Sequence, residues 1–346
     1  MIVDIDMHWH PESVFSDKSL LNAYIRSTKA AGQFVELRDI PGTKKQQMVV
    51  CQPEGVENLN LADVFVGVED RLKAMDEAGV DKGILRICCF QQWMNLELLK
   101  RVNNLMADYI KQYPGRFLGT AAVPPWGDEE SLDELKRCIY DLGFVAVLSA
   151  SHYGTRYLDE KEFRKYFKAI DKLGVPILVH HTPLPLDCNS ILKYGNLRRL
   201  YGRCQEQMTS TGRIIYSDLL EECPNLKIIP TQMAGAFFAY TSLMLPEESN
   251  IKEDVQRFDT EQGKIRKYLK NNIYFNITTP TGWSKNHLEF AVKELGAEHI
   301  LFGTSYPVRR EWLIKGVDHI RSLNISEQEK DLILGGNAQK LFNLKD

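Results

Sequence analysis

Eight short apolar runs recur along the chain, and each is followed by a longer segment with helical periodicity. Runs such as ILRICC and VPILVH are apolar on both faces, which is typical of strands in a parallel sheet that helices cover. This alternation predicts an α/β fold, a (β/α)₈ TIM barrel. An open, doubly wound sheet remains the alternative, because it uses the same alternation. The predicted strands cover residues 2–7, 83–89, 117–123, 144–150, 175–180, 226–231, 272–277 and 299–303.

The connections between these strands are not all simple. The stretch from about residue 11 to residue 60 is too long for a simple connection, so we expect it to fold over the strand ends as a lid or small hairpin. Residues 181–210 and 243–262 are also long, polar and irregular. No internal repeat or linker divides the chain. The sequence therefore predicts one barrel domain over residues 1–346, with long inserted loops over its C-terminal face.

Charge and composition exclude several classes of partner. The 43 Lys and Arg residues nearly balance the 46 Asp and Glu residues, and no block of like charge forms a nucleic-acid or membrane patch. No apolar stretch approaches the ~20 residues of a membrane span, and MIVDIDMHWHPE lacks the features of a secretory signal. We expect a cytosolic protein. Its seven cysteines lack CxxC spacing, which favours reduced, structural thiols, with a reactive thiol as the alternative.

Three histidines follow two of the predicted strands. Functional groups of such barrels project from the C-terminal strand ends, where strand one ends in His8-Trp9-His10 and strand five ends in His180. Alternate residues of a strand share a face, so His8 and His10 can face one ion together with His180. Three histidines can hold zinc and leave a fourth position open. Ordinary buried or surface histidines remain the alternative.

Other candidates lie on the same strands or just after them. Arg86 is unusual inside an apolar parallel strand, and either binds a substrate carboxylate or pairs with an acid. Asp6 precedes His8 by two residues and can face the interior below it. Trp93 follows strand two and is a candidate for a pocket wall. His181 also counts as a substrate-binding candidate, although alternation along an extended strand predicts that it faces away from His180.

Seven segments occur in an order that resembles one family: DMHWHP, RLKAMDEAGVDKGIL, PGRFLGTAAVPP, LGVPILVHH, CPNLKIIPTQMAG, HILFGTSYP and ILGGNAQKLFNL. This is the amidohydrolase-related family that contains aminocarboxymuconate-semialdehyde decarboxylase and related aromatic-acid decarboxylases. The resemblance runs along essentially the whole chain. It implies a metal-binding (β/α)₈ barrel with His8, His10 and His180 as ligands. Many relatives associate as dimers, so the resemblance also implies a homodimer.

The sequence departs from the family pattern at two positions. The family usually places a histidine after strand six, where this chain has Gln232, and an aspartate after strand eight, where this chain has Ser305. Glutamine does not titrate, so it cannot replace histidine as a general acid or base. A serine hydroxyl neither adds negative charge to an ion nor accepts a proton well at neutral pH.

Two main hypotheses follow, with Gln232 and Ser305 as the catalytic candidates. The first is a metal-dependent enzyme that decarboxylates or hydrolyses a small cyclic or aromatic carboxylate; decarboxylation fits better because it needs no activated water. The second is a metal-free barrel, either with altered chemistry or as a non-catalytic binding protein. A structural or interaction protein without a small-molecule site is the third possibility.

Overall fold

The computed structural model describes residues 1–63, 65–244 and 262–345. Six strands form a parallel sheet in sequence order, and two further strands form a parallel pair. In the sheet these are β1 (Val3–Trp9), β5 (Lys82–Ile87), β6 (Phe117–Ala122), β7 (Ala146–Ala150), β10 (Ile177–His180) and β11 (Ile228–Pro230), and in the pair β12 (Phe275–Asn276) and β13 (Ile300–Leu301). Each of the eight predicted runs overlaps one of these strands.

Backbone contacts join the sheet and the pair into a closed ring. A bridge between Ile228 and Ile273 connects β11 to the segment before β12. On the other side, the Ile5 amide of β1 donates to the carbonyl of Phe302, just after β13, at 3.0 Å. The strands therefore close in sequence order, which confirms the (β/α)₈ barrel and excludes an open, doubly wound sheet.

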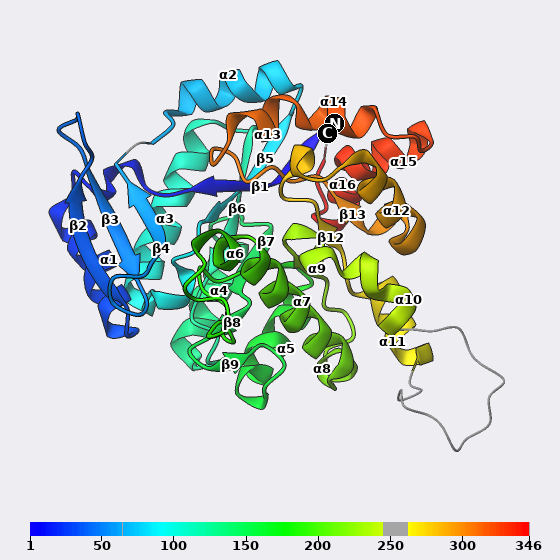
Figure 1. Cartoon of the computed structure of the whole chain (residues 1–346), viewed down its shortest axis with the longest axis horizontal. Coiled ribbons are helices and arrows are strands. Elements are labelled where there is room, and N and C mark those ends of the chain that lie inside the picture. Colours follow the sequence, from blue (N-terminus) through cyan, green and yellow to red (C-terminus); the bar gives the residue numbers. More distant parts are fainter. Residues whose placement is uncertain (64, 245–261, 346) are drawn as a thin grey trace.

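Helices surround this barrel, and most of them follow a strand (Figure 1). In the described part of the chain, none is both long and apolar enough to cross a membrane. Their bounds are α1 (Lys18–Ala30), α2 (Val68–Ala78), α3 (Leu96–Gln112), α4 (Glu129–Tyr140), α5 (Arg164–Leu173), α6 (Gly195–Arg199), α7 (Tyr201–Tyr216), α8 (Leu219–Glu222), α9 (Gln232–Ala236), α10 (Thr241–Met244), α11 (Gln262–Asn271), α12 (Lys285–Leu295), α13 (Arg310–Ile314), α14 (Gly316–Arg321), α15 (Glu327–Asp331) and α16 (Asn337–Leu341).

The long segment after β1 forms a small domain-like insertion beside the barrel. It contains α1 and an antiparallel three-stranded sheet of β2 (Phe34–Asp39), β3 (Gln46–Cys51) and β4 (Glu57–Ala62). This sheet agrees with the expected small hairpin, enlarged by one strand. A shorter hairpin of β8 (His152–Tyr153) and β9 (Arg156–Tyr157) follows β7.

Two other long connections were expected to be irregular. One of them contains helices, and the other lies mostly outside the described residues. Residues 181–210 are not irregular throughout, because α6 and the first turns of α7 begin at Gly195 and Tyr201. α6 buries Arg198, and α7 buries the polar residues Glu206, Gln207, Ser210 and Thr211. Both helices thus depart from a plain apolar stripe, which made their helical periodicity hard to recognise. Most of residues 243–262 lies outside the described residues.

Candidate active site

An arginine joins the first two barrel strands at their C-terminal ends. His8 of β1 and Arg86 of β5 are register partners in the parallel sheet. The Arg86 Nε donates to Asp6, and its Nη2 lies 2.6 Å from the Nε2 of His8. Asn276 donates to the second oxygen of Asp6 at 2.6 Å. Arg86 and Asp6 are fully buried, so of the two interpretations of Arg86, the structure shows the ion pair with an acid.

The same contacts fix the charge state of the neighbouring imidazoles. A guanidinium can only donate hydrogen bonds, so the Nε2 of His8 accepts and the ring is neutral. Burial, and after it the charge of Arg86, lowers the pKa of His8 to about 4. Burial followed by the Arg86 charge also places the pKa of His180 well below its ordinary value. Both rings are thus uncharged near neutral pH.

The structure brings together two of the three predicted metal ligands. The rings of His8 and His180 lie edge to face, 5.8 Å between centroids. His10 instead packs against Phe90, with its Nδ1 3.5 Å from the Tyr24 hydroxyl and its Nε2 3.2 Å from the Cys88 carbonyl oxygen. The alternation that predicted a shared face ends with β1 at Trp9, one residue before His10.

This arrangement does not fit a divalent ion held by His8, His10 and His180. The unprotonated nitrogen of His8 already accepts from the Arg86 guanidinium, so its lone pair is not available to an ion. Asp6, the nearest carboxylate, is engaged by Arg86 and Asn276. The three histidines therefore do not offer three available donor atoms to one ion.

His181 lies beside His180 and not on the opposite face. The two ring centroids are 3.9 Å apart, because β10 ends at His180 and the chain no longer alternates. The Sγ of Cys89, just after β5, lies 3.5 Å from the Nδ1 of His180. Burial, followed by the charge of Arg203, holds the pKa of His181 well below its usual range. A hydrogen bond from the Cys88 thiol lowers the pKa of Cys89.

Gln232 and Ser305 hold unusual backbone conformations at the ends of β11 and β13. Gln232 has φ 54°, and the left-handed conformation continues through Ala236, so α9 is a left-handed turn. The Gln232 amide donates to the Thr278 hydroxyl at 2.8 Å. Ser305 has φ 53°, and its amide donates to the carbonyl of Asp6 at 2.8 Å. Neither residue lines the mouth pocket described below.

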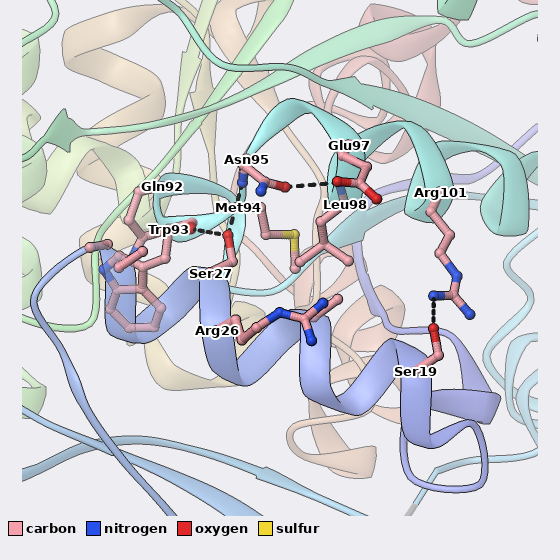
Figure 2. A pocket seen from close by; sticks show the side chains of 13 residues that line it. Ser19, Arg26, Ser27, Gln92, Trp93, Met94, Asn95, Glu97, Leu98 and Arg101 are labelled. Atoms are coloured by element: carbon pink, nitrogen blue, oxygen red, sulfur yellow. Dashed lines mark hydrogen bonds between the residues drawn. The ribbon is translucent and has the colours of Figure 1, made fainter.

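Trp93 lies in a short 3₁₀ helix before α3, and its ring contacts that of Phe90 at 5.5 Å between centroids. Its carbonyl accepts from the Ser27 hydroxyl at 2.7 Å, and that hydroxyl accepts from the Asn95 amide at 2.9 Å (Figure 2). The residue lines a pocket of about 510 Å³ between α1 and α3, on the outside of the barrel, and a second one of about 820 Å³ near His152. Its side chain thus borders both spaces.

A smaller pocket of about 240 Å³ opens at the barrel mouth between the end of β1, β4 and the segment after β13. Polar groups enter from His8, His10, Glu12 and Arg71. The apolar lining residues include Leu59, Leu61, Ala62, Phe65, Val66, Phe90, Pro307 and Val308.

Arg71 of α2 is a buried guanidinium in the wall of this mouth pocket. Only 4% of the residue is exposed, and its Nη2 donates to the His8 carbonyl at 3.1 Å. Its Nε and Nη1 have no hydrogen-bond partner, and it forms no ion pair with any acid in the described part of the chain. Burial lowers the pKa of Arg71. Sequence reasoning missed this residue, although it stands three residues after Val68 and four before Met75, on the apolar face of the helix.

Fold and site together define a (β/α)₈ barrel with a buried arginine in the pocket at its mouth, and comparisons place it in a family. The family model described as Amidohydrolase matches residues 5–344, so the chain belongs to the amidohydrolase family. The gamma-resorcylate decarboxylase of Polaromonas sp. (strain JS666) is 29% identical over 298 residues, which is 81% of this chain and 89% of that protein.

Two further relatives agree with this assignment. The 2-amino-3-carboxymuconate-6-semialdehyde decarboxylase of Dictyostelium discoideum is 25% identical over 254 residues, 72% of this chain and 67% of that protein. The dihydroxybenzoic acid decarboxylase of Polaromonas sp. JS666 was solved with bound manganese and the inhibitor 2-nitroresorcinol. It superposes with a TM-score of 0.71 at 23% identity and covers 99% of this chain and 97% of its own. The resemblance to aromatic-acid decarboxylases is confirmed.

Proposed function

We propose that this protein is a carboxy-lyase that releases carbon dioxide from a small aromatic carboxylate, with a hydroxybenzoate as the substrate class. The observation that carries the proposal is Arg71, a buried guanidinium with two unpartnered nitrogens in an apolar pocket beside His8. An unpaired buried charge is costly, and a carboxylate that accepts from both nitrogens would offset that cost. The names of the relatives, which act on gamma-resorcylate and dihydroxybenzoic acid, support the same substrate class.

The residues that line the mouth pocket would have different roles in such a reaction. Arg71 binds the carboxylate, and the apolar walls around Phe90 and Val308 hold the ring and exclude water. The bond between the ring and the carboxyl carbon then breaks, carbon dioxide leaves, and the electron pair stays on the ring carbon, which takes up a proton. His10 stands in the pocket wall, where its imidazole can supply this proton as a general acid. His8, held neutral by Arg86, keeps its proton on Nδ1.

No step of this scheme passes through a bound ion. The three-histidine site for zinc, and catalytic roles for Gln232 and Ser305, stay predictions from the sequence. Decarboxylation suits the mouth pocket better than hydrolysis because it needs no activated water. A homodimer and a cytosolic location likewise stay predictions.

The test is carbon dioxide release from 2,6-dihydroxybenzoate by the parent protein, an Arg71→Gln variant and an Arg71→Lys variant. Loss of hydrogen bonds to a charged group costs about 1.5–3 kcal/mol, so we expect KM to rise roughly 10- to 100-fold in Arg71→Gln. Arg71→Lys keeps the charge and should recover part of this loss. The matched control is Arg26→Gln, at an exposed arginine of α1 that lines the outer pocket.

Two results would overturn the proposal. The first is an Arg71→Gln variant, folded by circular dichroism, with the KM of the parent. The second is a parent protein that binds hydroxybenzoates without releasing carbon dioxide, which would favour the non-catalytic binding protein.

A further inference from the structure

Three potential ligand atoms converge next to the cluster of Asp6, His8 and Arg86, because the His180 ring contacts that of His8. Cys89, His180 and His181 each offer one ligand atom, and these atoms all lie within 4.8 Å of one another. The three residues are 3%, 1% and 5% exposed. They come from the C-terminal ends of two different strands, β5 and β10, which is where such barrels place functional groups.

The hydrogen bonds leave one ring nitrogen of each histidine without a partner. The Nδ1 of His180 lies 2.7 Å from the carbonyl oxygen of His181, and a carbonyl only accepts, so this nitrogen carries the proton. The Nε2 of His180 is then an unprotonated lone pair, and it is buried with no partner. The Nδ1 of His181 is likewise buried with no partner. Buried polar atoms are rarely left unsatisfied, so these two nitrogens indicate a group that binds them.

The thiol completes the set from the other strand. Cys89 has φ 58°, a left-handed conformation that a residue with a side chain rarely adopts. Its Sγ lies 3.5 Å from the protonated Nδ1 of His180, on the same ring as the unpartnered Nε2, and it receives a hydrogen bond from the Cys88 thiol at 3.6 Å. Such strained conformations persist where the surrounding structure requires them, and they are frequent at ligand sites.

We propose that Cys89, His180 and His181 form a centre for a soft or borderline divalent cation, with Zn²⁺ the best match, and leave a fourth position open. A thiolate with two neutral imidazoles is a ligand set that zinc prefers, and a hard ion such as Mg²⁺ does not. This set shares His180 with the three-histidine prediction and replaces His8 and His10, whose nitrogens already have contacts.

The charges around the cluster are compatible with a cation. Arg86 faces it, but Asp6 balances that charge through the buried ion pair. Arg203 and Glu206, of opposite sign, face the His181 side. The thiolate thus adds a negative charge to surroundings whose other charges offset each other.

The test uses Co²⁺ and Zn²⁺ as probes on the full chain. Metal-depleted protein is loaded with either ion, and bound metal is counted by elemental analysis after gel filtration. We expect one ion per chain and, with Co²⁺, an intense near-ultraviolet charge-transfer band, which requires a sulfur ligand. Cys89→Ser should lose that band and bind Co²⁺ at least tenfold more weakly. The control variant Cys88→Ser, at the neighbouring cysteine, should keep both the band and the affinity.

A second pair of variants separates the two ligand sets. His181→Gln should weaken Co²⁺ binding at least tenfold, and His10→Gln should leave it unchanged. The proposal would be overturned, in favour of the three-histidine site, if the parent bound one Co²⁺ per chain without the charge-transfer band. In that case His10→Gln would lose the bound ion and His181→Gln would keep it. Failure of the parent to retain either ion would also overturn it. The readout is metal binding, so its failure is distinct from a failure of the proposed decarboxylation.

Discussion

The Nη2 of Arg86 lies 2.6 Å from the Nε2 of His8, so a permanent positive charge stands beside an imidazole that the family resemblance assigns to a metal ion. Asp6 balances this charge from below, and Asn276 holds Asp6. The chain itself thus supplies a cation at the mouth of the barrel. The following predictions test this cluster and its surroundings.

Replacing Arg86 with Met should destabilise the protein strongly. The change leaves the Asp6 carboxylate buried without its partner, which costs about 3–5 kcal/mol for a broken buried pair. Urea denaturation at pH 7 measures the free energy of unfolding. The double variant Asp6→Asn with Arg86→Met also removes the unpaired carboxylate charge, so it should recover most of the lost stability. An Arg86→Met variant as stable as the parent would contradict the role of the pair.

Asp4 should make stability fall as pH rises. Burial raises the pKa of its carboxyl from 3.8 to about 7, against the hydrogen bonds from Thr304 that lower it. The folded state therefore holds a proton that the unfolded chain releases between these two values, so the contribution is full below pH 3.8 and is lost as pH rises through 7. The difference corresponds to about 4 kcal/mol.

The measurement is the free energy of unfolding of the parent minus that of Asp4→Asn, from pH 4 to pH 8. We expect this difference to decrease with pH. Subtraction is needed because His8, with its pKa lowered to about 4, contributes stability that is lost in the opposite direction, as pH falls below 6.5. A difference that stays constant across the range would contradict the raised pKa of Asp4.

The left-handed turn of α9 should not tolerate a side chain at its glycine. Gly235 has φ 69°, and a Cβ there would lie 1.9 Å from the carbonyl oxygen of Cys204. The clash and the conformational cost together predict that Gly235→Ala loses at least about 2 kcal/mol. Gly212 of α7 has no atom within 4 Å of such a Cβ, so Gly212→Ala should instead gain up to about 1 kcal/mol. Thermal unfolding of both variants provides the comparison.

Glu206 should be a strong stabiliser of the loops after β7 and β10. Its buried carboxylate accepts from the Ser151 hydroxyl at 2.8 Å, the Tyr157 hydroxyl at 3.1 Å and the Leu186 amide at 3.2 Å. Glu206→Ala leaves these donors without an acceptor, so we expect the free energy of unfolding to fall by about 3 kcal/mol or more in urea denaturation. Exposed Glu130 of α4 is the matched position, and its replacement by Ala should change stability by less than about 0.5 kcal/mol.

The strands of the barrel could be predicted from sequence because parallel strands are apolar on both faces. Within the site, the expected and observed side-chain directions differ where a strand ends. Alternation was extended to His10 and His181, but β1 ends at Trp9 and β10 at His180, and beyond those points the turn decides the direction of a side chain. Arg71 was missed because an arginine on a helix usually extends to solvent, whereas this one is buried against His8 and Tyr306, which are distant in sequence.

The Asp6 and Arg86 pair also has a consequence for how the protein is made. A bound ion must be captured from the medium, competes with other ions and is removed by chelators. The guanidinium of Arg86 is part of the polypeptide, so the positive charge beside His8 is present in every molecule once it has folded, whatever ions surround it. No insertion step and no supply of metal is needed to establish it.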